Sequence, residues 1–356
     1  MTALHDLATA LRAAAPPVHA LDLDLPAARV RLRTNSPAVL AELTTYYREF
    51  LAAAPAAPDL EILALAEVVP VHALELVVKE PDPGKPLKEA FVDLPDGRLV
   101  DKRRTGVALL MGEGHEIIAG PIERNVDQVC NFLHHRLMQR WIAGGAVLAH
   151  AAAVARGRRG LALTGRSGAG KSTLALHLMA VDPGLAFVSN DRLLLRREPH
   201  GGVTLRGVPK HPRVNPGTVL HNPALAPLLT DAERARYAAM DPVDLWPLEE
   251  KRDAVIDRCF GPGRFRLEAD LAALLVLTWR PGGGPAIFTP VDLDRRRDLL
   301  PLLRKELGLF FWPLASPAPA AADDALLDCL RGAPVYLAEG GVDLDAAARF
   351  AAERLA

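Results

Sequence analysis

The sequence predicts an α/β protein of two domains, and three observations support that prediction. The chain has 356 residues, of which 50% are hydrophobic, which is enough apolar material for two ordinary cores. Its first part alternates short apolar runs with helical patterns. After Gly144 and Gly145, two continuous apolar runs follow, and the second leads into a glycine-rich loop and a helical pattern. We therefore expect a smaller α+β domain over 1–144 and an α/β domain over 145–356.

The first domain is predicted to contain short strands and two helices. Apolar and polar residues alternate over 21–25 and 30–33, which is typical of half-buried strands. Pro37, preceded by Asn-Ser, marks the start of a helix that continues to Pro55. Further strands are expected over 59–68, 72–80, 89–94, 98–112 and 115–120, with turns at PDPGKP and PDG, and a helix over 122–142 ends the domain.

Beyond the glycine-rich loop, the second domain is predicted to continue with buried strands and helices. The run LAALLVLTW at 271–279 indicates a buried strand. The segment RRRDLLPLLRKELGLF at 295–310 predicts a helix that is broken at Pro301. A strand over 333–340 and a helix over 345–355 are expected to close the chain.

Charge, apolar runs and cysteine content exclude several classes of protein. The 42 Lys and Arg residues nearly cancel the 43 Asp and Glu residues, so the chain lacks the basic excess that binds nucleic acid or an anionic membrane. No apolar run approaches the roughly 20 residues that span a bilayer, and the N-terminus does not resemble a signal peptide. Cys130, Cys259 and Cys329 are far apart and odd in number, which fits neither a disulfide framework nor a zinc site. We expect a protein of the reducing cytoplasm, with no nucleic-acid or membrane partner.

The stretch GRSGAGKS, residues 165–172, fits the phosphate-loop (P-loop) pattern G-x-x-x-x-G-K-S between a predicted strand and a predicted helix. Its glycines allow backbone N–H groups to turn toward phosphate oxygens at the positive end of the helix. Lys171 adds a charge for the β and γ phosphates, and the Ser172 hydroxyl is a candidate ligand for Mg²⁺, with Thr173 the weaker candidate. The nucleotide-binding residues predicted in this way are Gly165, Arg166, Ser167, Gly168, Ala169, Gly170, Lys171, Ser172 and Thr173.

A carboxylate follows at the end of the next predicted strand. In LAFVSNDRLLL, an apolar run leads to Asn190 and Asp191, and a second apolar run comes after them. Asp191 could hold the metal or accept the proton of an attacking hydroxyl. The alternative is a turn between two strands, where Asn and Asp are common. His150, alone in an apolar strand, is by itself more typical of a core histidine.

A proline-rich segment further along offers two cations. In PKHPRVNPGT, the prolines stiffen the chain while Lys210 and Arg213 present positive charges. Such a loop could grip a transferring phosphate or an acidic acceptor, and the alternative is a surface connection with solvated charges. The segment WPLEEKRD at 246–253 is by default a solvated helix start, and a second metal site or lysine clamp there is a further hypothesis.

Four features together resemble the HPr kinase/phosphorylase family. They are the strand with His150, the segment GLALTGRSGAGKSTLALHL, the segment VSNDRLLL, and a hairpin that leads to LRGVPKHPRVNPGT. The resemblance covers about residues 146–220 well, and through LWPLEEKRDAVIDRCFGPGRF the chain is similar to the freestanding HPr kinase-related kinases, the B-type group. It implies the catalytic fold that the family shares with phosphoenolpyruvate carboxykinases, a functional His150 and a catalytic Asp191. It also implies ATP-grasp or amidotransferase-like partner proteins, beside which such kinases are thought to work.

Two positions depart from the family pattern. The family ends its strand with two Asp residues, and the first of them is Asn190 here, whose amide cannot act as a base. The signature of acidic and arginine residues that follows the hairpin in HPr kinases is replaced by Lys210, Arg213 and Asn215. HPr as the substrate and the reverse phosphorolysis therefore do not carry over to this chain.

The sequence thus predicts an ATP- and Mg²⁺-dependent kinase that transfers the γ-phosphoryl group to a hydroxyl or other acceptor on a protein or small molecule, with the first domain recognising a substrate or partner. The predicted catalytic residues are Asp191, His150, Lys171, Lys210 and Arg213, and the predicted metal ligands are Ser172 and Asp191. Two alternatives stay open. One is a nucleotide-sensing regulatory module, which Asn190 supports, and the other is a carboxykinase-type enzyme, which no residue specifically supports.

Overall fold

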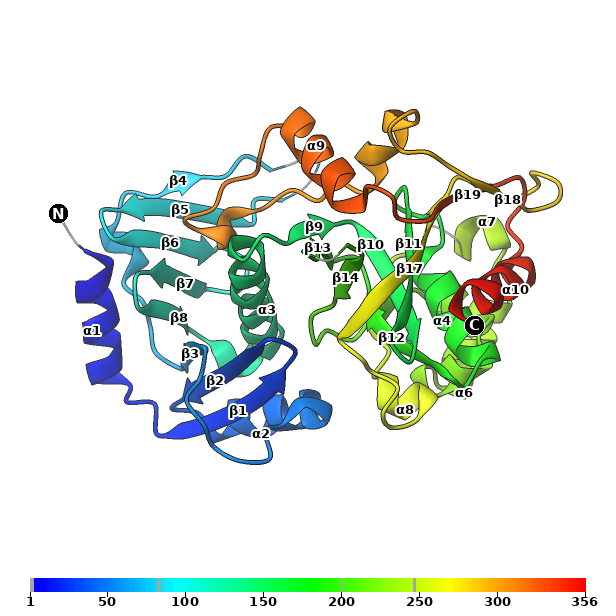
Figure 1. Ribbon diagram of the computed structural model, residues 1–356. Helices are drawn as coiled ribbons and strands as arrows, with labels where there is room; N and C mark the ends of the chain where they lie inside the picture. The colour runs from blue at the N-terminus through cyan, green and yellow to red at the C-terminus, as the bar shows by residue number, and fades with distance from the viewer. Residues whose placement is uncertain (1–2, 82–83, 85, 200, 246–247) are drawn as a thin grey trace. The chain divides into compact units, whose positions relative to one another are not determined.

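The protein is seen in a computed structural model that describes residues 3–81, 84, 86–199, 201–245 and 248–356. Its contacts divide the chain into two compact units, and it is a mixed α/β protein with several sheets (Figure 1). Unit 1 consists of Met1–Arg140 together with Glu306–Ser316, and unit 2 of Trp141–Lys305 together with Pro317–Ala356. The domain boundary at residue 144 and the roles of the two domains stay predictions.

Unit 1 is built on a sheet whose described strands run in the order β1-β2-β3-β8-β7-β6-β5-β4. The β2–β3 and β3–β8 pairs are parallel, and the other neighbours are antiparallel. The strands are β1 (His19–Leu25), β2 (Ala28–Thr34), β3 (Leu60–Leu65), β4 (Val77–Val78), β5 (Glu89–Leu94), β6 (Gly97–Lys102), β7 (Val107–Gly112) and β8 (His115–Ala119). The segment expected as one strand over 98–112 is a hairpin of two, and the strand expected over 72–80 is reduced to β4.

The helices of this part of the chain are α1 (Leu4–Ala14), α2 (Pro37–Tyr46) and α3 (Val126–Ala143), with 3-10 turns η1 (Arg48–Phe50), η2 (Val71–Ala73) and η3 (Ile122–Arg124). α1 carries Leu4, Ala8 and Leu11 at helical spacing, and this face is buried in the apolar core on the sheet. The helix expected to continue to Pro55 ends earlier, because the chain turns into η1 and then pairs with β1 at Leu51.

Residues Glu306–Ser316 complete unit 1, although they come long after the rest of it in the chain. Phe311 is only 2% exposed, and the rings of Phe310 and Phe311 lie 4.9 and 5.2 Å from the ring of His135 on α3. The buried Arg136 guanidinium donates a hydrogen bond of 2.8 Å to the carbonyl oxygen of Phe310. This late segment is therefore part of the packing around α3.

The helix expected over 295–310 is wrong. The chain forms two short 3-10 turns there instead, η5 (Arg297–Leu302) and η6 (Leu309–Phe311), with Pro301 inside the first. Proline has no backbone N–H to donate to a helical hydrogen bond. Leu299 and Leu300 of η5 and Leu303 of the turn that follows it are buried. The leucines whose spacing suggests a helix thus pack into the core of unit 2 instead.

Unit 2 contains a larger sheet in the order β12-β10-β11-β17-β14-β13-β9, with β19 beside β17 and β18 beside β19. Its strands are β9 (Val147–Ala149), β10 (Ala151–Arg156), β11 (Arg159–Gly165), β12 (Leu185–Ser189), β13 (Leu193–Arg197), β14 (Val203–Arg206), β17 (Glu268–Leu277), β18 (Ile287–Pro290) and β19 (Val335–Glu339). β15 (Arg213–Val214) and β16 (Arg252–Asp253) form a separate pair. β11 pairs with β10 on one side (antiparallel) and with β17 on the other (parallel), so the buried strand that leads into the glycine-rich loop lies inside the sheet.

Helices cover both faces of this sheet (Figure 1). α4 (Lys171–Val181) packs on β10, β11 and β12, and α10 (Leu344–Leu355) packs on α4, β11 and β17, whereas α9 (Pro319–Leu330) packs on β9 and β13. The shorter elements are α5 (Pro216–Leu220), η4 (Pro223–Leu228), α6 (Asp231–Ala238), α7 (Pro242–Leu245) and α8 (Ile256–Phe260). Among the described residues, no helix combines the length and apolar character needed to cross a bilayer.

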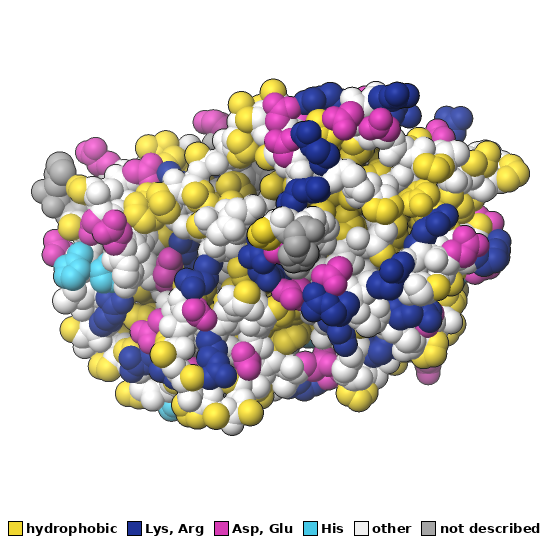
Figure 2. Space-filling model, in the orientation of Figure 1, with side chains coloured by type: hydrophobic (Ala, Val, Ile, Leu, Met, Phe, Trp, Pro, Cys, Tyr) yellow, Lys and Arg dark blue, Asp and Glu magenta, His cyan; other side chains and the backbone are white. Residues whose placement is uncertain are grey.

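The charged side chains of the described surface are mixed in sign. Figure 2 shows Lys and Arg side chains interspersed with Asp and Glu side chains over the face that it draws. This arrangement agrees with the nearly balanced totals of 42 basic and 43 acidic residues. The visible face therefore carries no broad patch of a single charge.

Candidate functional site

The glycine-rich loop connects the end of β11 to the start of α4. Gly165, the last residue of β11, lies so close to β17 that a Cβ there would come 2.7 Å from the carbonyl oxygen of Leu277. Gly168 and Gly170 have left-handed φ angles of 80° and 88°, which side chains other than glycine rarely adopt. The loop therefore needs glycine at these positions to reach the N-terminus of α4.

The Lys171 ammonium lies inside the loop. Lys171 is 8% exposed, and its Nζ donates to the carbonyl oxygens of Gly165 (2.9 Å) and Arg166 (3.0 Å). Burial lowers the pKa of Lys171, and the nearby Asp191 carboxylate opposes that change. The indole N–H of Trp279 donates to Ala169 O at 2.9 Å and so fixes the loop from outside. The loop thus encloses a buried cation whose hydrogen bonds a phosphate oxygen can replace.

The next two residues of α4 contact polar side chains on other elements. The Ser172 hydroxyl donates to Asn190 Oδ1 at 2.6 Å, and Thr173 Oγ1 lies 2.9 Å from Thr218 Oγ1 on α5. Asn190 directly follows β12, so the end of that strand is brought to the start of α4. Asn190 is therefore the direct partner of Ser172.

Asp191 has a basic side chain beside each of its carboxylate oxygens. Its Oδ1 lies 3.2 Å from His150 Nε2, and its Oδ2 accepts a hydrogen bond of 2.8 Å from Lys305 Nζ. Burial by itself would raise the pKa of Asp191, but the hydrogen bonds from His150 and Lys305 outweigh it and hold the pKa well below its usual range. Asp191 also has a left-handed φ of 70°, which is uncommon for a residue other than glycine. The turn after β12 therefore presents a carboxylate that is ionised at neutral pH.

The turn that carries Lys305 is fixed to the strand region that carries His150. The backbone N–H of His150 donates to Leu303 O at 2.7 Å. A single β-bridge joins Ala149, which precedes His150, to Arg304, which follows Leu303. Thr164 Oγ1 lies within hydrogen-bond distance of His150 O (2.9 Å) and Leu302 O (2.8 Å). Thr164 belongs to β11, immediately before the loop. His150, Lys305 and the loop thus share one rigid support.

The proline-rich segment adds further cations near Asp191. Gly207, two residues before this segment, lies so close to β12 that a Cβ there would come 1.9 Å from the carbonyl oxygen of Val188. Burial, with the charge of Arg192 beside it, lowers the pKa of Lys210 to about 8, while Asp191 acts in the opposite direction. Lys210 and Arg192 are therefore two positive charges close to the Asp191 carboxylate.

Other residues singled out in the sequence lie in ordinary surface contacts. Arg213 is exposed on β15, where its Nε lies 3.4 Å from Asp253 on the paired strand. Lys251 pairs with Glu249 at 3.1 Å, and Glu250 accepts a hydrogen bond of 2.5 Å from Tyr237 on α6. Trp246 and Pro247, from the hypothesis of a second metal site or lysine clamp, lie outside the described residues.

Mg²⁺ in proteins requires oxygen ligands, which Ser172 and Asn190 can provide. Among the described residues, no three His, Cys, Asp or Glu side chains cluster in a way that could hold a metal ion. Ser172 and Asn190 offer two oxygen atoms 2.6 Å apart, which suits a hard cation that keeps phosphate and water ligands as well. Asp191 follows Asn190 in the chain, but its oxygens contact His150 and Lys305. The residues fit Mg²⁺ that arrives with a phosphate chain.

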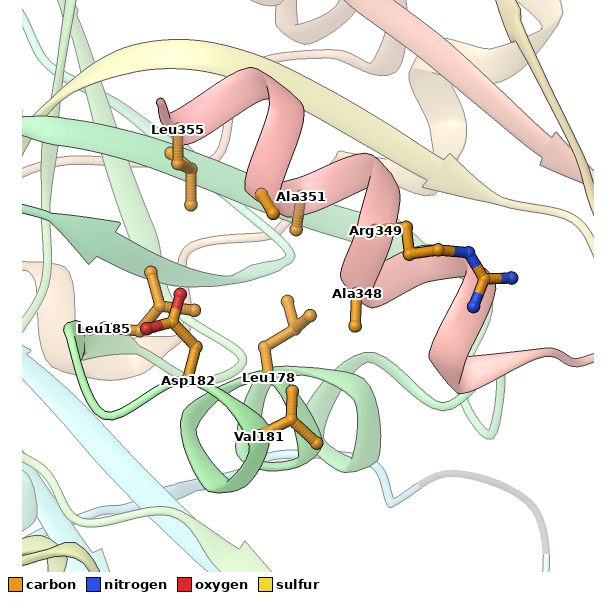
Figure 3. A pocket seen from close by; sticks show the side chains of 9 residues that line it. Leu178, Val181, Asp182, Leu185, Ala348, Arg349, Ala351 and Leu355 are labelled. Atoms are coloured by element: carbon orange, nitrogen blue, oxygen red, sulfur yellow. The ribbon is translucent and has the colours of Figure 1, made fainter.

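A groove at the far end of α4 is separate from this site. Figure 3 shows side chains of α4, α10 and the turn after α4 around it, and its volume is about 280 Å³. Leu178, which lines the groove, is about 10 Å along the helix axis from Lys171 at 1.5 Å per residue. Its lining is mostly apolar, with Asp182 and Arg349 as the charged exceptions. The groove is therefore not part of the candidate site around the glycine-rich loop.

Comparisons with known proteins show distant likeness to solved structures. No protein-family model matches the chain, and no curated protein sequence matches it. Among solved structures, the chain is similar to the HPr(Ser) kinase/phosphatase from Coxiella burnetii, with 13% identity over 58% of this chain and 87% of that chain, and a TM-score of 0.28. A likeness at that TM-score is too distant to support an argument about fold or activity.

Proposed function

We propose that the protein is an ATP- and Mg²⁺-dependent kinase of the HPr kinase-like type, with a P-loop catalytic domain in unit 2. The observation that carries the proposal is that the glycine-rich loop and the Asp191 carboxylate belong to the same site. The loop that holds the buried Lys171 ammonium leads into α4. The ionised Asp191, with His150 and Lys305 as its partners, follows the end of β12, which packs on α4. The acceptor is a protein or a metabolite, and unit 1 recognises it or a partner, which by family resemblance is an ATP-grasp or amidotransferase-like protein.

Each group of the loop would have a defined task. The backbone N–H groups at the start of α4 would bind the β and γ phosphates, and Lys171 would exchange the carbonyl oxygens of Gly165 and Arg166 for phosphate oxygens. Ser172 and Asn190 would hold Mg²⁺, which supplies positive charge against the phosphates when it is bound. Phosphoryl transfer depends mainly on such positioning and charge stabilisation.

Asp191 would orient the acceptor rather than bind its proton strongly. Its pKa is held far below the usual range, so the carboxylate is a weak base at neutral pH. A loose phosphoryl-transfer transition state needs little proton removal from the attacking oxygen. Each carboxylate oxygen has a second lone pair beyond the contacts to His150 and Lys305, and it can accept a hydrogen bond from an acceptor hydroxyl.

The test is label transfer from γ-labelled ATP in the presence of Mg²⁺, using acceptors from the protein's own source separated into metabolites and macromolecules. Lys171→Ala should lower the rate on the order of 10²-fold or more, because it removes a charge that stabilises the transferring phosphate. Lys79→Ala is the matched control, since Lys79 is an exposed lysine that pairs with Glu89 at 3.6 Å in unit 1. Transfer by Lys171→Ala at the parent rate would contradict this site.

A nucleotide-sensing module is the second candidate function. It is favoured by Asn190 at the position of a family carboxylate and by the two basic partners that already contact Asp191. It predicts ATP binding that Lys171→Ala weakens, with no labelled product in either acceptor fraction. A carboxykinase would instead use nucleotide in an oxaloacetate-dependent reaction, and no described residue gives that alternative specific support.

A further inference from the structure

Lys305 is a second lysine at the phosphate-loop site, and no sequence motif indicates it. Its Nζ donates to Asp191 Oδ2 at 2.8 Å, which uses one of the three donors of an ammonium group. Its side chain is 29% exposed, so the ammonium reaches solvent beside the carboxylate. The charge of Lys305 also lowers the pKa of Lys171, although burial is the larger cause. The charges of Asp191 and Lys305 therefore both act on the Lys171 ammonium, in opposite directions.

The backbone holds Lys305 in this place. Leu302 and Leu303, just before it, accept hydrogen bonds from Thr164 Oγ1 and from the backbone N–H of His150. Leu303 is fully buried, so this part of the turn is anchored in the core. The Lys305 side chain, which is long and flexible, can change partner without any movement of this support. The anchored backbone thus keeps the Lys305 ammonium near Asp191.

We propose that Lys305 contacts the terminal phosphate of a bound nucleoside triphosphate, which it reaches by sharing or leaving its hydrogen bond to Asp191. This inference rests on the proposed function. A terminal phosphate held by Lys171 would bring negative charge close to Lys305, and charge-assisted hydrogen bonds are strong. A nucleoside diphosphate lacks that group, so Lys305 would distinguish triphosphate from diphosphate while Lys171 binds both.

The experiment measures equilibrium binding of Mg²⁺–ADP and of the non-transferable β,γ-imido analogue of Mg²⁺–ATP by calorimetry at one fixed salt concentration. Lys305→Met should weaken the triphosphate analogue by about tenfold or more, which is the effect of losing one hydrogen bond to a charged group, and should leave ADP affinity nearly unchanged. Lys305→Arg keeps the charge and should keep most of the preference for the triphosphate. Lys79→Met, the exposed control, should change neither affinity.

The outcomes separate this inference from the proposed function. If Lys305→Met weakens both ligands equally or neither, while the parent binds the triphosphate analogue, then Lys305 has only a structural role and the proposed function stands. If the parent binds neither ligand, both are overturned. Binding of ADP by Lys305→Met at the parent affinity also shows that the variant is folded, so a selective loss of triphosphate affinity cannot come from unfolding.

Discussion

The charge of Lys210 depends on pH near the neutral range. Burial and the neighbouring Arg192 lower its pKa to about 8, so the side chain is an ammonium below that pH and neutral above it. We expect kcat/KM, which reports the free enzyme, to fall as the pH rises through about 8. Lys210→Arg should remove this fall, because a guanidinium stays charged throughout that range. A pH profile of both forms measures the effect, and the same fall in Lys210→Arg would contradict the assignment.

Individual site residues differ in how far the sequence could predict them. Lys171 and Ser172 follow from a local motif, since eight consecutive residues define both the loop and the start of the helix. Asp191 is indicated by its place after an apolar run, whereas a role for His150 required the family resemblance, because a lone histidine in an apolar strand is more typical of a core residue. Lys305 could not be found in this way, since it lies 114 residues from Asp191 and meets it only through the fold.

The segment from Gly207 to the proline-rich stretch is an element whose path depends on one missing side chain. A Cβ at Gly207 would come 1.9 Å from the backbone oxygen of Val188, and backbone cannot move aside easily. Gly207→Ala should therefore destabilise the protein by about 1–3 kcal/mol or more through overpacking. Urea unfolding measures this change. Gly217→Ala is the matched control, because its Cβ would meet only an ordinary contact of 3.7 Å, and a stability loss equal in both variants would contradict the steric explanation.

For the helices and strands, the type of an element is easier to predict from the sequence than its extent. β10 and β11 are buried as their continuous apolar runs predict, because both faces of the sheet are covered. The segment over 295–310 shows the opposite case. Its leucines have helical spacing, but Pro301 and the partners available in both units draw the chain into separate short turns. Local spacing could not reveal those distant partners.

For the whole molecule, the stability of unit 1 depends on a buried ion pair beside its late segment. Arg136 on α3 is 4% exposed, and its Nε lies 2.6 Å from Glu116 Oε2. Burial raises the pKa of Glu116, and Arg136 opposes that change. Arg136→Met leaves the carboxylate buried without its partner and should cost about 3–5 kcal/mol. Chemical denaturation measures the loss. Arg295→Met is the control, since the Arg295 side chain is 87% exposed, and an equal effect there would contradict the argument.

The late segment also has a consequence for the order in which the protein can be made. A ribosome releases the residues of unit 1 up to Arg140 first, but Phe310 and Phe311, the aromatic partners of His135, emerge only after Lys305 at the end of the main part of unit 2. Unit 1 is therefore the first to begin folding and cannot be finished until more than half of the remaining chain has been synthesised. Nascent chains that stop before residue 306 lack the segment that packs on α3. The apolar surface that is then exposed is of the kind that chaperones and proteases recognise.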